Sequence, residues 1–426
     1  MRYLKHACGA IAAAALAVLI AFFSLVAELT WKPWFRYPPL CDVRSGGGDI
    51  IDRPECFFSE DYYQARSKFR RLALAAGFEV KSFEVVPPSQ HGDVYMMDVA
   101  VRKPAGATIS GRVVHTSGIH GVEGFAGSGI QCSILSHIAS KKLDTNKTLI
   151  FVHAANPFGM VHLRRFNEEN VDLNRNALTP QEFNYLINER DPNIAGYNDL
   201  DPVLNPEDTS ITSLLYNSVL IILKYGMSHI KRAVVSAQYL KPAGIFYGGQ
   251  NLQRTYEIMN EAIVLTDLGV FEGGNATMID IHTGLGPSGV DTLLTADSED
   301  FDYFAALQSS LGHLEESPVE CVGIGCTGGG PKNPNEPEFA ADVAKGYDLT
   351  QGDAGTFWKK KSNRHAKVRH VSQEFGTLNI MLALPVMIIE NAAFQKATED
   401  HSRWAKYNSD YFYVRTPEWT RSLAER

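Results

Sequence analysis

Three apolar runs of this chain each end at a glycine or a polar residue, and they restrict the fold that the chain can adopt. They are GRVVHTSG at 111–118, TLIFVHAAN at 148–156 and ATMIDIHTG at 276–284. Short runs rich in β-branched residues are typical of strands buried on both faces of a sheet. A helical pattern over 125–139 separates the first two runs, which favours parallel strands joined by helices. We therefore predict an α/β fold in which helices flank a mixed, mostly parallel sheet.

Further segments extend this prediction on either side. Residues 59–78 form an amphipathic pattern in which Ser59 could cap a helix and Gly77 could end it. We expect residues 177–240 to be largely helical. Residues 381–391, MLALPVMIIEN, are expected to form a late strand or a junction between a helix and a strand.

The N-terminal segment is an uncharged run of 21 residues from Ala7 to Ala27, long enough to cross a bilayer as a helix. Arg2 and Lys5 precede the run, so the positive-inside rule keeps the N-terminus in the cytoplasm and sends the rest of the chain across. Two interpretations remain open: residues 1–29 are an uncleaved single-pass anchor, or a signal peptide cut after Ala27. Both place the main domain outside the cytoplasm, either bound to the membrane or secreted or periplasmic.

Prolines and glycines concentrated in residues 30–58 predict a linker, which leaves 59–426 as the main domain. The chain has 40 basic and 48 acidic side chains and a formal net charge of −8. Nucleic-acid binding depends on a basic surface that such a chain lacks, so we expect no nucleic-acid partner. Two cysteine pairs lie close in sequence and form either local disulfides in an exported domain or unpaired thiols: Cys41 with Cys56, and Cys321 with Cys326.

The densest chemical signal is HTSGIHGVEGFAGSGIQ at 115–131, where His120 and Glu123 stand three residues apart between a predicted strand and a predicted helix. An imidazole and a carboxylate at this spacing can bind one Zn²⁺, and catalytic zinc needs a third protein ligand and an open position for water. His282, at the end of the third apolar run, is the best candidate, because open α/β sheets place site residues at strand ends. Asp280, two residues earlier, points to the same side and could orient the His282 imidazole.

A second segment, NPFGMVHLRRFNEENVDLNRN at 156–176, carries Asn-Pro-x-Gly, then Arg-x-Asn, then Val-Asp-Leu-Asn-Arg-Asn. With these motifs the chain resembles the carboxypeptidase A-like zinc peptidases, and residues 165–176 look most like the bacterial murein-peptide amidases. The chain also resembles an uncharacterised branch of that superfamily, related to the succinylglutamate desuccinylase/aspartoacylase group. Four motifs carry this second resemblance, HGVEGFAGS at 120–128, YGG at 247–249, IHTGLG at 281–286 and EFGT at 374–377. The resemblance extends from about residue 61 to residue 395.

The resemblance implies a role for each matching residue. His120, Glu123 and His282 would bind the zinc ion, and Glu374 would be the general base. These two roles agree in chemistry, because zinc lowers the pKa of its bound water to about 7 and a nearby carboxylate can then accept the proton.

The resemblance also implies how the substrate is held. Arg165 would polarise the scissile carbonyl and stabilise its oxyanion. Asn174 and Arg175 would bind a free α-carboxylate, which a guanidinium can clamp with two parallel hydrogen bonds.

Alternatives remain at two of these positions. Arg164 and Arg165 are adjacent, so their side chains face apart, and we assign Arg165 to the site from the register of the motif. Glu390, in MIIENAAF, competes with Glu374 for the role of the base, and it could instead be a buried structural carboxylate or a second polar group of the site. We place Glu374 first. Two further histidines near the motifs are expected to line strands rather than to bind metal: His115 and His153.

The sequence therefore predicts a zinc metallohydrolase of the carboxypeptidase or N-acyl amino acid deacylase type. It would cleave an amide bond by attack of a zinc-bound water, on a small peptide or an N-acyl amino acid with a free carboxylate. Two other functions stay open: hydrolysis of another small acyl compound or ester, and a non-catalytic binding module on the same fold.

Overall fold

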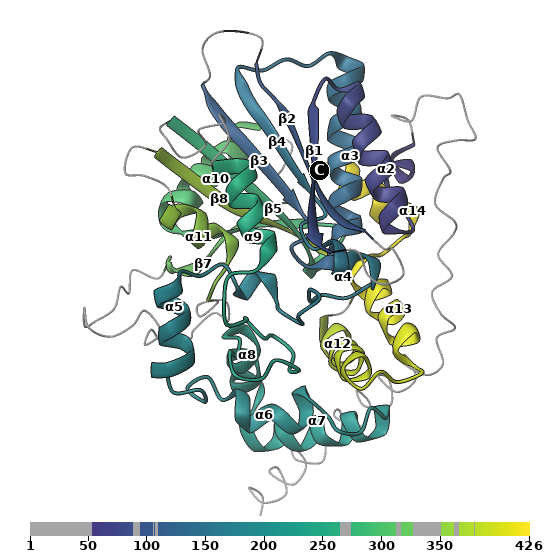
Figure 1. Cartoon of the computed structure of the whole chain (residues 1–426), viewed down its shortest axis with the longest axis vertical. Coiled ribbons are helices and arrows are strands. Elements are labelled where there is room, and N and C mark those ends of the chain that lie inside the picture. The colour runs from purple at the N-terminus through teal and green to yellow at the C-terminus, as the bar shows by residue number, and fades with distance from the viewer. Residues whose placement is uncertain are drawn as a thin grey trace, which may run out of the picture.

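The computed structural model describes residues 53–87, 94–104, 106, 110–264, 274–311, 317–326, 351–361, 366–378 and 380–426. Within them, eight strands form one sheet in the order β1-β2-β4-β3-β5-β8-β6-β7 (Figure 1). The strands are β1 (Glu79–Val86), β2 (Tyr95–Arg102), β3 (Gly111–Ser117), β4 (Lys147–His153), β5 (Gly274–Ser288), β6 (Asp291–Asp297), β7 (Val319–Gly325) and β8 (Ala366–Gly376).

The sheet is mixed and mostly parallel, which confirms the predicted class. β3 pairs in parallel with both β4 and β5, β5 with β8, and β6 with β7. The antiparallel pairs are β1–β2, β2–β4 and β6–β8. Because β3, β5 and β8 run in the same direction side by side, their carboxyl ends meet at one edge of the sheet.

Helices cover both faces of the sheet (Figure 1). On one face, α2 (Tyr62–Ala75), α3 (Gly124–Lys141) and α14 (Pro417–Glu425) share a core that includes Phe69 and Trp419. On the other face, α9 (Arg254–Met259) and α11 (Ala354–Lys361) bury aromatic side chains against strand residues. α10 (Ser298–Leu311) lies beside β6 and β7. Burial of both faces explains why the central strands appear as continuous apolar runs.

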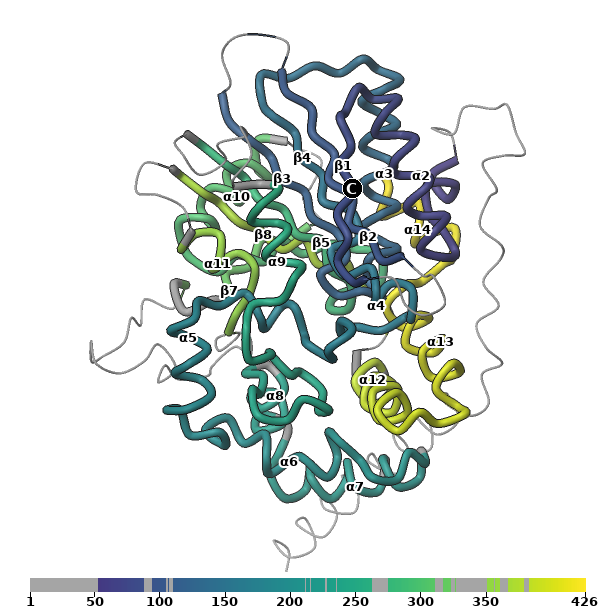
Figure 2. The backbone as a smooth tube through the Cα atoms, viewed as in Figure 1, coloured from purple at the N-terminus to yellow at the C-terminus, as the bar shows by residue number. Residues whose placement is uncertain are grey.

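A separate group of helices gathers at one end of the sheet (Figure 2). Five of them share a third apolar core: α6 (Tyr197–Leu204), α7 (Ile211–Tyr225), α8 (Met227–Val235), α12 (Ile380–Gln395) and α13 (His401–Phe412). The shorter elements are η3 (Pro54–Phe57), η4 (Gly121–Glu123), α4 (Pro157–Val161), η5 (Leu173–Arg175), α5 (Pro180–Asn184), η6 (Tyr185–Glu189) and η7 (Asn260–Val264).

Two local predictions are wrong. The first helix begins at Tyr62, because the side chain of Asp61 accepts a hydrogen bond from the backbone N–H of Gln64 and caps the helix. Ser59 is instead buried against Tyr413, to whose hydroxyl its backbone N–H donates. Gly77 has a φ of +79° just after the helix, as expected of a residue that ends it.

Residues 381–391 belong to helix α12 and not to a strand or a junction. Ala383, Val386 and Ile389 of this segment are buried in an apolar core shared with the surrounding helices rather than in the sheet. A short apolar run does not reveal by its period which of these two environments it occupies.

The N-terminal predictions are tested only in part. Residues 54–58 differ from the predicted linker, because Phe57 and Phe58 are fully buried in the core of the domain. The predicted membrane segment and residues 30–52 lie outside the described residues. No helix in the described part of the chain is long and apolar enough to span a bilayer. Cys321 and Cys326 form a disulfide, Cys56 is disulfide-bonded, and Cys41 lies outside the described residues.

Candidate metal centre

The loop after β3 positions His120 and Glu123. Gly118 has a φ of +78°, a backbone conformation that residues other than glycine rarely adopt. The glycine therefore allows the chain to turn sharply there. A Cβ on Gly121 would lie 2.1 Å from the carbonyl carbon of Gly159, so the loop packs directly on the backbone of α4. Both predicted ligands are buried at this turn, between β3 and α3.

His282 reaches the same point from β5. The nitrogen Nδ1 of His282 lies 3.2 Å from Nδ1 of His120 and 3.3 Å from Oε2 of Glu123. His120 Nδ1 lies 2.8 Å from Oε1 of Glu123. Two ligands each about 2 Å from a tetrahedral ion are about 3.3 Å apart, so these separations suit one zinc ion. Among the described residues these three form the one group of at least three His, Cys, Asp or Glu side chains able to hold a metal.

Two carboxylates hold the far sides of the imidazoles. Asp280 Oδ2 lies 2.9 Å from Nε2 of His282, and Asp172 Oδ1 lies 3.2 Å from Nε2 of His120. Each carboxylate accepts a hydrogen bond from the Nε2–H group, which leaves the Nδ1 lone pair directed at the shared point. The contact of Asp280 was expected from the sequence. Asp172 was missed, although it stands in the Val-Asp-Leu-Asn-Arg-Asn motif.

The donor atoms at this point are arranged as a cation site would be. If both imidazoles are neutral, their Nδ1 lone pairs face one another and the Glu123 carboxylate across about 3 Å. If both are protonated, two N–H groups face one another instead. A divalent ion bound to all three side chains removes both conflicts, so the donor set fits zinc.

The ionisation of these buried groups reflects the same arrangement. Burial raises the pKa of Glu123, but the two neighbouring histidines outweigh it and hold that pKa below its ordinary value. Burial lowers the pKa of His282, yet Asp280 and Glu123 raise it well above the ordinary value. Burial also raises the pKa of Asp172, and Arg165 and His120 reverse the shift so that the carboxyl stays ionised.

The two adjacent arginines face opposite directions, as expected. Arg165 donates from Nε to Oδ2 of Asp172 at 2.9 Å, and its Nη1 lies 3.5 Å from Oε1 of Glu123. Arg164 points away, to Glu390 on α12. Arg165 is therefore the arginine beside the metal ligands.

Asn174 and Arg175 lie on η5, directly after Asp172. The backbone N–H of Asn174 donates to Oδ1 of Asp172 at 3.0 Å, so the segment that carries both residues is tied to a ligand-orienting carboxylate. Arg175 is 7% exposed, and its Nη1 donates to the carbonyl of Asn174. Its Nε is buried with no hydrogen-bond partner among the described residues. A buried guanidinium with an unused donor is suited to an anionic partner.

Glu374 and Glu390 occupy different environments. Glu374 on β8 is the register partner of His282 on β5, and its Oε1 accepts from the backbone N–H of Leu285 at 2.9 Å. Burial and the negative charge of Glu123 raise the pKa of Glu374 to about 6. Glu390 has no exposed surface and contacts Arg164 and His401. Of the two, only Glu374 lies beside a predicted metal ligand.

The histidines expected to be structural have partners inside the fold. His115 Nδ1 lies 3.3 Å from the side-chain nitrogen of Gln131. His153 Nε2 lies 2.9 Å from the hydroxyl of Ser128. Neither belongs to the metal-ligand group.

Comparison with known families identifies one match. The model of the family described as "Protein of unknown function (DUF2817)" matches residues 58–320, more than half of the chain. The chain belongs to this family. The matched region contains the three candidate metal ligands as well as Arg165 and Arg175, and it ends before Glu374. No curated protein matches this chain.

Solved structures similar to this chain include the two groups that its motifs resemble. Carboxypeptidase A from Helicoverpa armigera matches at 12% identity with a TM-score of 0.42, over 86% of this chain and 74% of that chain. A Shewanella frigidimarina NCIMB 400 protein, named provisionally as a succinylglutamate desuccinylase/aspartoacylase, matches at 14% identity with a TM-score of 0.35, over 76% and 72%. Metallo-carboxypeptidase from Burkholderia cenocepacia matches at 10% identity with a TM-score of 0.35, over 79% and 68%. With TM-scores below 0.5, these likenesses carry no conclusion about the activity of this member of the family.

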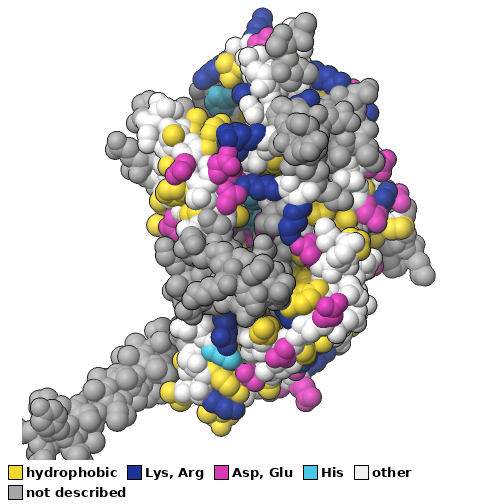
Figure 3. Space-filling model, turned by 90° about the vertical axis from the view of Figure 1, so that its left-hand side faces the viewer, with side chains coloured by type: hydrophobic (Ala, Val, Ile, Leu, Met, Phe, Trp, Pro, Cys, Tyr) yellow, Lys and Arg dark blue, Asp and Glu magenta, His cyan; other side chains and the backbone are white. Residues whose placement is uncertain are grey.

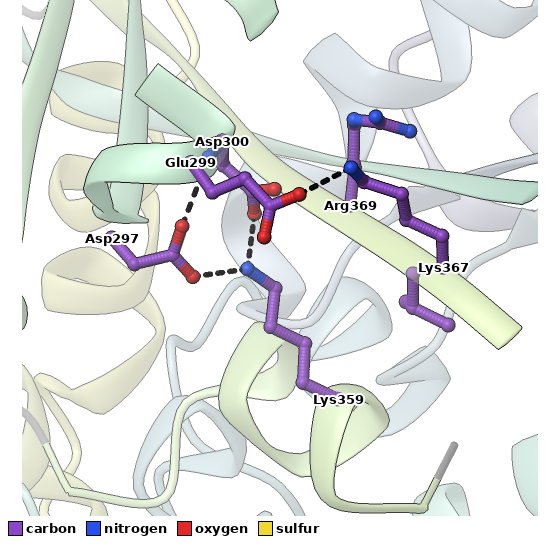
Figure 4. Close-up of a pocket in the computed structure, with 7 residues that line it drawn as sticks. Asp297, Glu299, Asp300, Lys359, Lys367 and Arg369 are labelled. Carbon is purple, nitrogen blue, oxygen red and sulfur yellow. Dashed lines mark hydrogen bonds and ion pairs between the residues drawn. The ribbon is translucent and has the colours of Figure 1, made fainter. Parts of the chain in front are cut away.

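A charged pocket lies beside the amino end of β8, where Lys367 and Arg369 contribute to its lining (Figure 4). It has a volume of about 240 Å³. Lys359 contacts both Asp297 and Asp300, and Lys367 contacts Glu299. Basic and acidic side chains also lie next to one another on the face drawn in Figure 3. The charges of the charged pocket contact opposite charges, and within the described ranges its side chains form no group able to hold a metal.

Proposed function

We propose that this protein is a zinc-dependent hydrolase of amide bonds. One observation carries the proposal: two buried imidazoles, each held at Nε2 by a carboxylate, direct Nδ1 at a point shared with the carboxylate of Glu123. Three protein ligands leave a fourth position open, which distinguishes catalytic zinc sites from structural ones. Zinc bound there would lower the pKa of water and polarise a substrate carbonyl.

Glu374 is proposed as the general base. It lies on the strand next to His282, at the same edge of the sheet as the other ligands. Its raised pKa, about 6, suits a group that accepts a proton from the attacking water and later returns it to the leaving amine. The hydrogen bond from the backbone of Leu285 holds one carboxylate oxygen and leaves the other for the substrate side.

Arg165 and Arg175 are proposed to recognise the substrate. Arg165 uses Nε to hold Asp172, which leaves guanidinium donors for the oxygen of a scissile carbonyl. Arg175, with Asn174 beside it, would bind a carboxylate of the substrate. We therefore propose a small peptide or an N-acyl amino acid, with a free carboxylate near the bond that is cleaved.

We also propose that the domain works outside the cytoplasm, attached through residues 7–27 or released by cleavage after Ala27. The disulfide between Cys321 and Cys326 supports this location, because disulfides persist mainly in oxidising compartments. Protease accessibility of the domain in intact cells tests it, and full protection of the domain would contradict it.

The direct test of the activity is turnover of a substrate library. The zinc-loaded chain is incubated with carboxy-terminal dipeptides, muropeptides, N-acyl amino acids and matched esters, and product amines, acids and alcohols are quantified. We expect hydrolysis that a chelator abolishes and that added zinc restores. Cleavage of the esters alone would favour an esterase on the same site. Tight zinc binding without any hydrolysis would favour a binding module instead.

A further inference from the structure

A second buried arginine lies next to the proposed site and takes no part in the proposed reaction. Arg164 and Glu390 both have no exposed surface, and Nε of Arg164 lies 2.7 Å from Oε1 of Glu390. Nη2 of Arg164 donates to the side-chain oxygens of Asn170 at 3.0 Å and Asn391 at 2.8 Å. The guanidinium carbon lies 3.4 Å from the centre of the Phe394 ring.

Stability is a poor explanation for this ion pair. Removing two charges from water is costly, and well-packed apolar side chains of similar size are often as stable or more stable. The pair is also incompletely satisfied, since Nη1 of Arg164 and Oε2 of Glu390 are buried without hydrogen-bond partners among the described residues. What needs explanation is therefore the fixed position that these directed contacts give to the Arg164 side chain.

The backbone of this segment is joined to the metal-ligand loop. The carbonyl of Arg164 accepts from the N–H of Val122 at 2.8 Å, and the carbonyl of Arg165 accepts from the N–H of Gly121 at 3.2 Å. These two donors stand between His120 and Glu123 in the chain. Any shift of the arginine segment is therefore transmitted to the loop that carries two of the three ligands.

The side chains join the same segment to helix α12 and to the turn at residues 242–244. Asn170 donates to the carbonyls of Pro242 and Gly244 at 2.9 and 3.1 Å. Asn391, next to Glu390 on α12, donates to the carbonyl of Ala243 at 2.9 Å. The network thus connects three parts of the chain that are far apart in sequence, and Arg164 is its centre.

We propose that Arg164 and Glu390 are positioning residues that set the register of residues 164–172. In this register Arg165 faces the metal ligands and Asp172 meets His120. The expected loss of turnover rests on the proposed function. The expected loss of zinc affinity does not depend on turnover, because residues 164–165 hold the loop that carries His120 and Glu123.

The test replaces the pair with apolar side chains in the full chain, as Arg164→Met/Glu390→Met. Because apolar replacement of a buried ion pair preserves stability in other proteins, we expect cooperative unfolding near the wild-type temperature. Zinc affinity, measured by chelator competition, should fall about ten- to hundredfold, as for loss of groups that orient metal ligands. Turnover should fall at least as much through kcat. A folded double variant with wild-type zinc affinity and kcat would overturn the proposal.

Two further variants keep the test decisive. Arg164→Lys retains the charge beside Glu390 but loses the planar fork to Asn170 and Asn391, so zinc affinity should fall by less than in the double variant. If the double variant does not fold, unchanged zinc affinity in Arg164→Lys would overturn the proposal. Lys359→Met/Asp297→Leu, which removes an ion pair from the charged pocket, is the matched control and should bind zinc normally. If the wild-type chain hydrolyses nothing, the proposed function fails while the zinc comparison still decides this inference.

Discussion

The two ends of strand β8 carry very different groups of charged side chains. Near its carboxyl end, Glu374 lies beside His282 and the other candidate metal ligands. Near its amino end, Lys367 and Arg369 line the pocket in which Lys359 meets two aspartates (Figure 4). The pocket is an evident hollow rich in charge, yet its charges neutralise one another. At the other end, the Nδ1 atoms of His120 and His282 converge on one point, and the Nε2 atom of each imidazole is already held by a carboxylate. This convergence marks the candidate metal site.

The largest expected effect is at the metal group. His282→Ala removes one of three ligands, so zinc content should drop well below one ion per chain and turnover should fall about a thousandfold or more. Metal analysis and kcat/KM measure both. The control Lys359→Met, on α11 beside the amino end of β8, should retain zinc and activity. Equal losses of zinc and of kcat/KM in the two variants would show that the two ends of β8 do not differ in function.

The next largest effect separates the base from the ligands. Glu374→Gln keeps the shape of the side chain and removes its ability to accept a proton, so kcat should fall about 10²- to 10⁴-fold. Zinc content should be unchanged, since the three ligands remain. Steady-state kinetics and metal analysis on the same sample test this. A variant that retains kcat would remove Glu374 from its proposed role.

Substrate recognition should respond more moderately. Arg175→Met removes a charge-assisted clamp worth about 1.5–3 kcal/mol, so KM should rise about ten- to hundredfold for substrates with a free carboxylate. The matched amide of each substrate lacks the carboxylate and should show little change between wild type and variant. The same rise in KM for acid and amide would argue against a carboxylate clamp.

A smaller effect is expected from the residue that orients His282. In Asp280→Asn the amide oxygen can still accept from Nε2 of His282, but the negative charge is lost. We expect zinc affinity about tenfold weaker, measured by chelator competition, with wild-type kcat once zinc saturates the site. Unchanged affinity would show that Asp280 has no part in metal binding.

The smallest effect belongs to the charged pocket. Burial raises the pKa of Asp297, but contact with Lys359 and backbone N–H groups outweighs burial and lowers it. A lowered pKa contributes stability above the unfolded value of about 3.9, and this contribution is lost as pH falls through the folded value. Because the pair is partly exposed, Asp297→Asn should lower the free energy of unfolding by about 1 kcal/mol or less at pH 7. Urea unfolding at pH 7 and pH 3 should show the difference shrinking, and a constant difference would contradict the assignment.

Several features of the site were predictable because they depend on local order along the chain. His120 and Glu123 share one turn, so their spacing and the neighbouring glycines already indicate that both could bind the same metal ion. The side chains of Arg164 and Arg165 point in opposite directions because the two residues are neighbours in the chain. Strands β3, β4 and β5 were predictable because they lie in the middle of the sheet, where burial of both faces leaves apolar runs.

Other features depended on contacts between segments that are distant in sequence. Asp172 lies 52 positions from His120, and only the fold brings its carboxylate to Nε2 of that imidazole. The segment 381–391 is equally apolar as a buried helix or as a buried strand, and its packing among helices decided the outcome. By itself the sequence determined the class of sheet and the donor atoms available for a metal. The tertiary structure decided which carboxylate stands behind each histidine and which glutamate lies beside them, because burial and register are properties of the assembled chain.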